Sequence, residues 1–421
     1  MNRTLVFVLI LLPAVLHGQQ DSIHEPIIPL QHLLDEALLR NPEIQAALHQ
    51  MSVVAERVPQ AGGLPDPELT YMREQMPGFR WSEAMMQKLE LMQMFRFPSK
   101  VSAQTDLAQI QAEHAHHDHL EKINEVIAKL KTGYVELWYL QQAQVLSREN
   151  LLLLQQLAEI ARTRYSVGSG LLQDALKASV EVGKAENQLI VLGQKERGVV
   201  AMIRAIVDRP TADTLGRAVL PEEPVFTPSI DTLQTLALQL RPMLQHDSMV
   251  VEESRTMLSL AKREYLPDLK VGVQYVTYPT GDFRGWSIIA GITLPFAPWT
   301  LGKAGGRVEE ATATVNRSTS VYRSSRSMVL ASVRDLYARV RSAQQRLRRY
   351  RADLLPEARQ ALRASFTAYQ TGKADYLMTI DANRMYIDLS MEALMARMEF
   401  EQALADMERA VGDDHIAAIK N

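Results

Sequence analysis

A run of histidines is the part of the sequence best equipped for chemistry. Glu113-His114-Ala115-His116-His117-Asp118-His119 holds four of the ten histidines of the chain. Residues three apart share a face of a helix, so His114 would pair with His117 and His116 with His119. Imidazoles spaced in this way can bind zinc or copper. These four histidines are therefore a candidate metal site, and a solvated polar helix face is the alternative interpretation.

Methionines also gather in one short region, between residues 72 and 94. They are Met72, Met76, Met85, Met86, Met92 and Met94. Thioether sulfur suits copper(I) or silver(I), but methionine also fills irregular apolar surfaces. The sequence favours the filling role.

Catalysis and nucleic-acid binding find no support in the sequence. It contains no Gly-rich phosphate loop, nucleophile elbow or two-His-plus-Glu zinc motif, and no cysteine, so neither an enzyme nor a cofactor is expected. A net charge of -3 excludes a strongly basic nucleic-acid binder. The Arg-rich segment 339–351 is expected to be a solvated or salt-bridging helix face. Pro356, in the same helix, predicts a kink or a local break.

The first residues predict export. Arg3 precedes an apolar run from Leu5 to Leu16, and Gly18 follows, which together are typical of a signal peptide over residues 1–18. The run is too short to span a bilayer. The mature chain would begin near Gln19, and the lack of cysteine there excludes a lipoprotein. No later stretch is apolar enough for a membrane helix, so membrane insertion would have to use strands.

The remaining sequence reads as two copies of one pattern, offset by roughly two hundred residues. Four short matches occur in the same order in both copies. They are Arg40-Asn41-Pro42 with Arg241-Pro242, Leu64-Pro65-Asp66-Pro67-Glu68-Leu69 with Leu266-Pro267-Asp268-Leu269, Phe97-Pro98 and Lys100 with Pro298 and Lys303, and Tyr165-Ser166-Val167-Gly168 with Tyr369-Gln370-Thr371-Gly372. We therefore predict two structural repeats, at 30–208 and 230–412.

Each repeat is predicted to contain a helix, a β-hairpin, a very long helix and a closing helix. In the first repeat these lie at about 30–58, 67–95, 99–165 and 171–207, and in the second at about 231–264, 267–296, 303–369 and 374–411. A lead segment at 19–29 precedes the repeats, a Pro-rich linker at 209–229 joins them, and a tail follows at 413–421.

The long helices carry a heptad stripe. Its apolar residues are Ile127, Leu130, Tyr134 and Leu137 in the first, and Val329, Val333, Leu336 and Val340 in the second. Steps of three and four predict a left-handed coiled-coil seam. A helix of about 65 residues extends for about 100 Å. That length indicates a molecule that spans a distance rather than a compact domain.

The two predicted hairpins alternate as membrane strands do. The clearer pair has Leu269, Val271, Val273 and Tyr275 on one face of its first strand, and Trp286, Ile288, Ala290, Ile292 and Leu294 on one face of its second. Runs of about nine or ten residues with period two match outer-membrane barrel strands, and a small soluble sheet is the alternative.

Counting strands predicts the oligomer. Four strands per chain cannot close a barrel, and an open edge in lipid leaves backbone groups unpaired. Two chains would give eight strands with a filled interior, whereas three would give twelve and room for water and solute. We therefore expect a mainly α protein with a membrane β-barrel, in which a homotrimer forms a 12-strand barrel in outer membrane lipid and a helical tunnel.

The chain resembles the TolC-type outer membrane efflux proteins over essentially the whole mature sequence. The resemblance rests on the duplicated element order, the Leu64-Pro65-Asp66-Pro67 lead-in, the turns at Tyr165 and Tyr369, and Asp381-Ala382-Asn383-Arg384. It implies a trimeric channel-tunnel in the outer membrane of a Gram-negative bacterium, extending into the periplasm. It also implies docking of a periplasmic adaptor (membrane fusion) protein and an inner-membrane resistance-nodulation-division pump.

The resemblance further implies a periplasmic gate at the two glycine turns. Tyr369 matches the family's gate tyrosine, Asp174 its acidic partner on the first repeat, and Asp381 an acid that rings the aperture. A phenol–carboxylate hydrogen bond is charge-assisted, and at a wet tip such contacts contribute about 1–3 kcal/mol each. A few of them can hold a pore shut and still yield to a partner. The alternative is that both residues cap helix ends.

Two positions depart from the family pattern at this gate. Ala374 stands where an arginine is usual, and Met378 where a second ring acid is usual. The neighbouring Asp375 is a candidate replacement for that acid. These departures bear on the details of gating rather than on the tunnel.

Heavy-metal cations are the leading expectation for the solute. The Leu-Pro-Asp-Pro lead-in and Pro295-Phe296-Ala297-Pro298-Trp299 look similar to segments in outer-membrane partners of heavy-metal pumps. A multidrug or type I protein secretion duct is the alternative within the same class. A periplasmic coiled-coil adaptor is the alternative of another class, but the β-rich lipoyl-like domains that it would need are not evident in the sequence.

Overall fold

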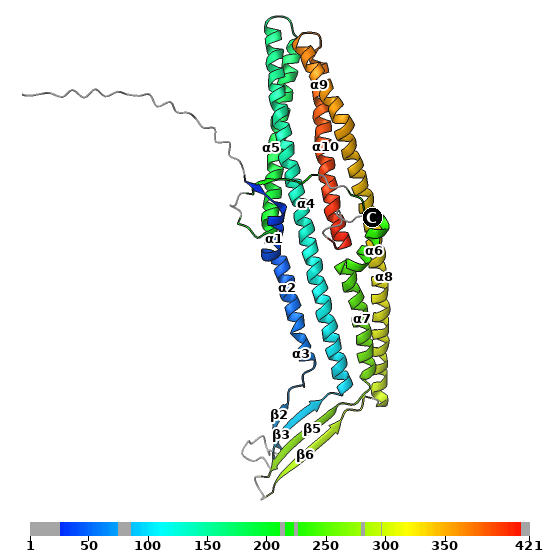
Figure 1. Ribbon diagram of the computed structural model, residues 1–421. Coiled ribbons are helices and arrows are strands. Elements are labelled where there is room, and N and C mark those ends of the chain that lie inside the picture. The colour runs from blue at the N-terminus through cyan, green and yellow to red at the C-terminus, as the bar shows by residue number, and fades with distance from the viewer. Residues whose placement is uncertain are drawn as a thin grey trace, which may run out of the picture.

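The computed structural model describes residues 26–74, 86–210, 215–222, 226–278, 283–295 and 297–413. The chain is an elongated rod, with helices running along its length and a four-stranded sheet at one end (Figure 1). The predicted signal peptide, Met76, Met85 and the turns that join the strands of each hairpin lie outside the described residues, as does the tail after Asp413.

Two very long helices form the body of the rod. α4 (Pro98–Ser166) is 69 residues long, or about 100 Å at 1.5 Å per residue. α8 (Pro298–Arg349) continues through a π-helical turn (Tyr350–Leu354) into α9 (Leu355–Gln370). The break predicted at Pro356 thus takes the form of a π turn just before it, consistent with the backbone hydrogen bond that proline cannot make.

The helix that opens each repeat is interrupted, contrary to the single helices expected at about 30–58 and 231–264. The first is α1 (Leu30–Arg40), α2 (Pro42–Ala55) and α3 (Arg57–Ala61), and the second is α6 (Ile230–Leu240) and α7 (Pro242–Arg263). Proline disfavours the helical region for the residue that precedes it. Asn41 and Arg241 accordingly have ψ values of 123° and 118°, and each proline begins a new helix.

The predicted heptad stripes lie in the core. Leu130, Tyr134 and Leu137 are fully buried against the closing helix α5 (Leu172–Ile206) and α1, while Ile127 is only half-buried and Val126 takes the core position beside it. The second stripe is buried with the closing helix α10 (Tyr376–Val411) and α6. Each repeat therefore has a core of its own along the rod.

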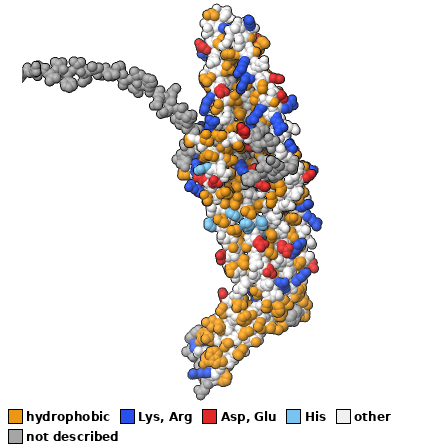
Figure 2. Space-filling view, viewed as in Figure 1, with side chains coloured by type: hydrophobic (Ala, Val, Ile, Leu, Met, Phe, Trp, Pro, Cys, Tyr) orange, Lys and Arg blue, Asp and Glu red, His pale blue; other side chains and the backbone are white. Residues whose placement is uncertain are grey.

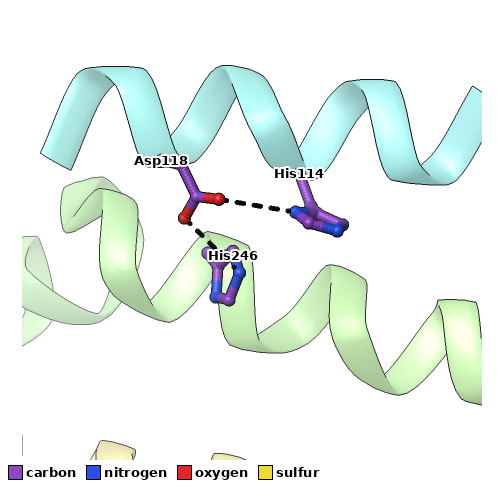
Figure 3. Close-up of side chains that lie close together, drawn as sticks. All are labelled: His114, Asp118 and His246. Carbon is purple, nitrogen blue, oxygen red and sulfur yellow. Dashed lines mark ion pairs between the residues drawn. The ribbon is translucent and has the colours of Figure 1, made fainter. Parts of the chain in front are cut away.

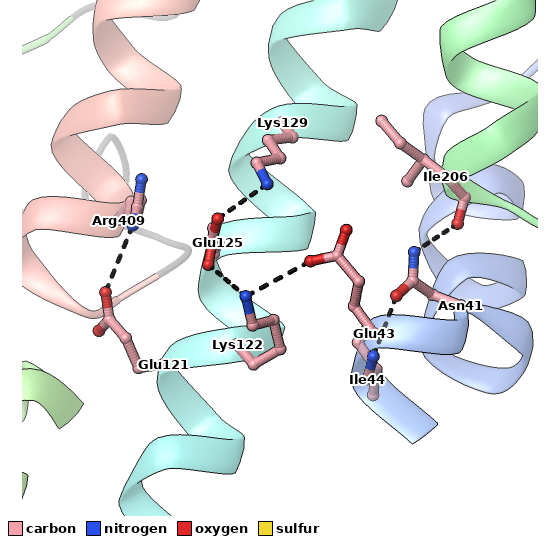
Figure 4. A network of polar contacts seen from close by, with 9 residues as sticks. All are labelled: Asn41, Glu43, Ile44, Glu121, Lys122, Glu125, Lys129, Ile206 and Arg409. Carbon is pink, nitrogen blue, oxygen red and sulfur yellow. Dashed lines mark hydrogen bonds and ion pairs between the residues drawn. The ribbon is translucent and has the colours of Figure 1, made fainter. Parts of the chain in front are cut away.

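Polar networks occupy the middle of the rod, where α2, α4 and α10 approach one another (Figure 4). Glu125 lies 2.8 Å from both Lys122 and Lys129, and these contacts, led by the one with Lys122, lower the pKa of Glu125 to about 2 despite its partial burial. Lys122 also reaches Glu43 at 3.4 Å. The Lys122–Glu43 contact therefore adds a charged link between α2 and the long helix to the apolar packing of Ile44 in the same core.

The sheet is antiparallel, in the order β2-β3-β5-β6. Its strands are β2 (Glu68–Glu74), β3 (Met86–Phe95), β5 (Leu269–Thr277) and β6 (Arg284–Ile292). The first hairpin therefore pairs directly with the second, through β3 and β5. Of the methionine cluster, Met72 lies on β2, and Met86, Met92 and Met94 lie on β3. A short parallel pair, β1 (Ile27–Ile28) and β4 (Arg217–Ala218), lies beside the middle of the rod.

One face of this sheet is apolar from edge to edge. Two registered rows cross it, Leu69–Leu91–Val273–Ile288 and Tyr71–Leu89–Tyr275–Trp286. Trp286 is 74% and Ile288 82% exposed, and Figure 2 shows hydrophobic side chains covering this end of the rod. The alternate row, Thr70–Glu90–Gln274–Ser287, is polar. The two faces thus differ sharply in polarity, as the predicted alternation requires.

The helices themselves are amphipathic or polar rather than uniformly apolar. Across the described ranges, none combines the length and the hydropathy that a bilayer-spanning helix needs.

Candidate functional site

Two glycine turns, one from each repeat, form the end of the rod opposite the sheet (Figure 1). Gly168 and Gly372 have φ values of 74° and 77°, a left-handed conformation that glycine adopts without a Cβ clash. The Gly168 amide donates to the Tyr165 carbonyl oxygen at 3.0 Å, and the Gly372 amide to that of Tyr369 at 3.1 Å. The repeated Tyr-x-x-Gly sequences therefore fold into the same kind of turn.

Tyr369 is packed into the small-residue core beneath these turns and is only 2% exposed. The Arg164 guanidinium carbon lies 4.8 Å from the centre of its ring, so the two turns meet through a cation–π contact. Burial raises the pKa of Tyr369; the nearby Asp174 charge adds to this effect, and Arg164 opposes it. Within the described residues, no hydrogen bond joins Tyr369 to its predicted partner Asp174, which lies half-buried in the first turn of α5.

Arg164 was not singled out from the sequence. The resemblance pointed to an arginine at the position of Ala374, and in this chain a guanidinium near Tyr369 comes instead from the other turn. A Cβ added to Gly372 would lie 2.9 Å from Arg164 Nη2, so glycine there leaves room for this side chain. The guanidinium beside Tyr369 therefore comes from Arg164 of the first repeat.

Tyr376, at the start of α10, is the second buried phenol of the tip. Its ring lies 6.0 Å from that of Tyr369, close to edge-on. Its buried hydroxyl has no hydrogen-bond partner among the described residues. Burial, together with the negative charge of Glu181, raises its pKa to about 12. Tyr376 is therefore neutral at physiological pH, and its hydroxyl is a buried polar group that the tip leaves unsatisfied.

An ion pair crosses the tip from α10 to α5. Arg384 Nη2 lies 2.6 Å from Glu181 Oε1, and Lys184 lies 2.9 Å from the same oxygen. Burial on its own would raise the pKa of Glu181, but its hydrogen bonds to these two cations outweigh burial and lower it. Asp381, a predicted ring acid, is 62% exposed and lies 3.7 Å from Arg384. Asp381 therefore faces solvent beside the Arg384–Glu181 ion pair.

Asp375 has a structural contact at the same turn. Its carboxylate accepts the Met378 amide at 2.8 Å and caps the N-terminus of α10. Further along α10, the buried Asn383 donates to Asn150 of α4 at 2.8 Å, which joins the two repeats below the turns. A groove of about 720 Å³ runs between α5 and α10, lined by apolar Leu172, Leu176, Val180 and Leu377 among charged residues.

The four predicted metal-site histidines do not form one cluster. His116 and His117 contact each other with tilted rings whose centres are 5.8 Å apart. Burial lowers the pKa of both His117 and His119. His114 instead faces His246 of α7, with ring centres 5.0 Å apart. His246 was missed because nothing in the sequence relates it to a histidine more than a hundred residues away.

Comparisons with known proteins agree with this architecture. Residues 33–197 and 233–413 match the family described as outer membrane efflux protein. No functionally curated sequence is similar enough to match the chain.

Several solved structures share the fold over most of their length. The outer membrane protein VceC from Vibrio cholerae is 17% identical with a TM-score of 0.76, covering 91% of this chain and 96% of its own. The Campylobacter jejuni CmeC outer membrane channel is 13% identical with a TM-score of 0.79, covering 91% and 85%. The open state of the Neisseria gonorrhoeae MtrE outer membrane channel is 16% identical with a TM-score of 0.77, covering 91% and 89%. Identities this low bear on the fold alone.

Proposed function

The chain belongs to the outer membrane efflux protein family, and from this premise we propose that three copies form a passive outer membrane duct for solute delivered from the periplasm. The family is one of efflux channels rather than enzymes. The apolar face of the sheet is the observation that carries the proposal. The sheet is four strands wide, carries a polar row on its other face and adjoins α4, a helix about 100 Å long. These features suit a barrel segment joined to a periplasmic tunnel.

Assembly follows from the edges of the sheet. β2 and β6 are its outer strands, and in lipid their backbone groups need partners. Within one chain, β3 of the first repeat pairs with β5 of the second. The equivalent pairing for the free edges joins β6 of one copy to β2 of the next. Three copies then close twelve strands, leaving a water-filled interior.

The tip is the proposed gate of this duct. Buried Tyr369 and Tyr376, the Arg164 contact and the Arg384–Glu181 pair join the two repeats at the end away from the sheet. Asp174, Asp375 and Asp381 add negative charge around them. A periplasmic adaptor and an inner-membrane resistance-nodulation-division pump are the proposed partners at this end, and the energy for transport comes from the pump.

Heavy-metal cations are the solute class we propose for this duct. Support comes from the sequence, in the similarity of Leu64–Pro67 and Pro295–Trp299 to segments of outer-membrane partners of heavy-metal pumps. Deleting the gene and challenging cells with copper, zinc, nickel, cobalt, silver, dyes and antibiotics tests this class. Sensitivity to metals alone supports it, whereas sensitivity to dyes and antibiotics alone supports a multidrug duct.

The duct itself is tested on the purified mature protein. We expect a detergent-dependent trimer that scatters as an elongated rod and opens water-filled channels in planar bilayers. A compact, monomeric and detergent-independent particle would contradict the proposal.

A further inference from the structure

Two histidines and an aspartate meet where the first repeat packs against the second. His114 and Asp118 lie one turn apart on α4, and His246 projects from α7 toward both (Figure 3). Each residue offers a ligand atom within 4.8 Å of those of the other two. Figure 2 shows histidine side chains gathered near the middle of the rod, well away from the tip.

The separations suit a small cation. Asp118 Oδ2 lies 3.7 Å from His114 Nδ1, and Asp118 Oδ1 lies 3.4 Å from His246 Nε2. Ligand atoms at 2.0–2.1 Å from a tetrahedral zinc ion are about 3.3 Å from one another. The Asp118 carboxylate is therefore already within a few tenths of an ångström of the required separation from each histidine. The two imidazoles must turn toward each other to share an ion with it, since the three ligand atoms lie within 4.8 Å of one another. Within the part of the chain that the structure describes, the buried His114 Nδ1 has no hydrogen-bond partner, so this nitrogen is available as a metal ligand.

The other nitrogen of each ring faces a carboxylate. His114 Nε2 lies 3.6 Å from Glu253, which Gln111 holds through a hydrogen bond of 2.8 Å. His246 Nδ1 lies 3.2 Å from Asp247. Zinc-bound histidines usually donate their second N–H to a carboxylate, because this fixes the tautomer and makes the ligand nitrogen more basic. His246 has this arrangement with Asp247, and Glu253 lies on the corresponding side of His114, just beyond hydrogen-bond distance.

The net charge of the cluster also favours a bound cation. Three carboxylates, those of Asp118, Glu253 and Asp247, surround two imidazoles, which leaves the cluster negative when the histidines are neutral. A divalent cation bound to the three inner ligands would offset most of this charge. The solvent-exposed Asp118 leaves a path for the ion to enter and a place for water as a fourth ligand.

We propose that His114, Asp118 and His246 bind one first-row transition-metal dication of the Zn²⁺ type, which fastens α4 to α7. The metal replaces a cluster of repelling carboxylates with bonds between the two repeats, so it stabilises their packing in the middle of the rod. This role concerns the wall of the protein and does not depend on the solute that the duct carries. His116, in the same histidine tract, takes no part because its side chain lies on the exposed side of α4.

The test is zinc binding by the purified full-length protein in detergent, followed by calorimetry and by metal analysis after dialysis. We expect one Zn²⁺ per chain and a higher thermal unfolding midpoint with zinc. His246→Gln should weaken zinc binding by at least about 100-fold and abolish the thermal shift, whereas Glu253→Gln should weaken binding by about 10–100-fold. Asp118→Asn is the second ligand variant, in case His246→Gln folds poorly.

His116→Gln is the matched control, because it removes a histidine from the same tract without touching the cluster. It should bind zinc as the wild type does. Loss of binding in His116→Gln, equal binding by His246→Gln and the wild type, or no zinc bound by the wild type would each overturn the proposal. Cobalt(II) gives an independent readout, since a site with these ligands should produce intense visible absorption that is absent from Asp118→Asn.

Discussion

Lys100 and Asp268 lie in different repeats, yet Lys100 Nζ is 2.9 Å from Asp268 Oδ1 at the junction of the sheet and the helices. The same carboxylate oxygen accepts the Phe97 amide at 3.0 Å. The aspartate that precedes β5 therefore holds the start of α4, just after β3 ends. Both residues belong to motifs that recur in the sequence, as Asp66 and Lys303, and both of these are exposed in the single chain.

Charge reversal at this second pair tests the trimer directly. If β6 of one copy pairs with β2 of the next, Asp66 of the partner subunit comes to the start of α8. Its expected ion-pair partner there is Lys303, one helical turn beyond the position equivalent to Lys100. We expect Asp66→Lys and Lys303→Asp each to lower the yield of trimer in detergent, because like charges then face each other. The double variant should restore it, as measured by size-exclusion chromatography with light scattering. Failure of the double variant to recover would argue against this pairing.

The two faces of the sheet should respond oppositely to a charge. Ile288→Arg puts a cation on the apolar face and should cost about 2–4 kcal/mol if that residue sits near the bilayer midplane. Little trimer should then reach the outer membrane. Ser287→Arg, one residue away on the polar face, should assemble normally and shift ion selectivity toward anions in planar bilayers. Equal loss of assembly in both variants would contradict the assignment of the faces.

Removing the Tyr369 hydroxyl and the Asp174 charge should open the tip. Tyr369→Phe with Asp174→Ala deletes the buried phenol hydroxyl and the neighbouring charge while keeping the aromatic packing. We expect higher single-channel conductance in planar bilayers. Tyr165→Phe is the control, because this tyrosine occupies the equivalent turn but is exposed. A double variant with wild-type conductance would count against a gating role for this pair.

The Arg384–Glu181 pair should make the tip acid-sensitive. The pKa of Glu181 lies below its ordinary 4.5, so its stabilising contribution is complete above that value and disappears as pH falls through the lowered pKa. Conductance should therefore be flat from about pH 8 to about pH 5 and rise only in stronger acid. Glu181→Gln should conduct more at neutral pH and lose the acid step. If Glu181→Gln still shows the rise in conductance at acid pH, that rise comes from the titration of another group.

The two turn glycines give a matched comparison. Gly168→Ala and Gly372→Ala both force alanine into a left-handed conformation, at about 1–2 kcal/mol each. Only the second places a Cβ against Arg164, since nothing lies within 4 Å of one at Gly168. Gly372→Ala should displace Arg164 from Tyr369 and raise conductance, while Gly168→Ala should only lower the thermal midpoint. Identical conductance in the two variants would show that the Arg164 contact does not restrain the tip.

Local patterns in the sequence were enough to predict the long helices, the strands and their order along the chain. Heptad spacing at Leu130, Tyr134 and Leu137 predicted buried positions because side chains at those steps share a helix face. The Asn41-Pro42 and Arg241-Pro242 pairs were recognised as a repeated motif but not as helix breaks, although proline carries that signal. Those breaks were therefore available in the sequence and were missed.

Contacts between residues far apart in the chain could not be predicted from the spacing of residues along it. Histidine spacing alone suggested that His114 would pair with His117, whereas packing of α4 on α7 brings His246 to it. Arg164 reaches Tyr369, and Arg384 reaches Glu181, only because the helix pairs that carry the two glycine turns lie side by side at the tip. The sequence by itself determined the repeat, the long helices, the glycine turns and the two-sided strands, since each depends on neighbours a few residues away. Only the tertiary structure decided which charged and aromatic groups face each other, because that depends on how whole helices pack.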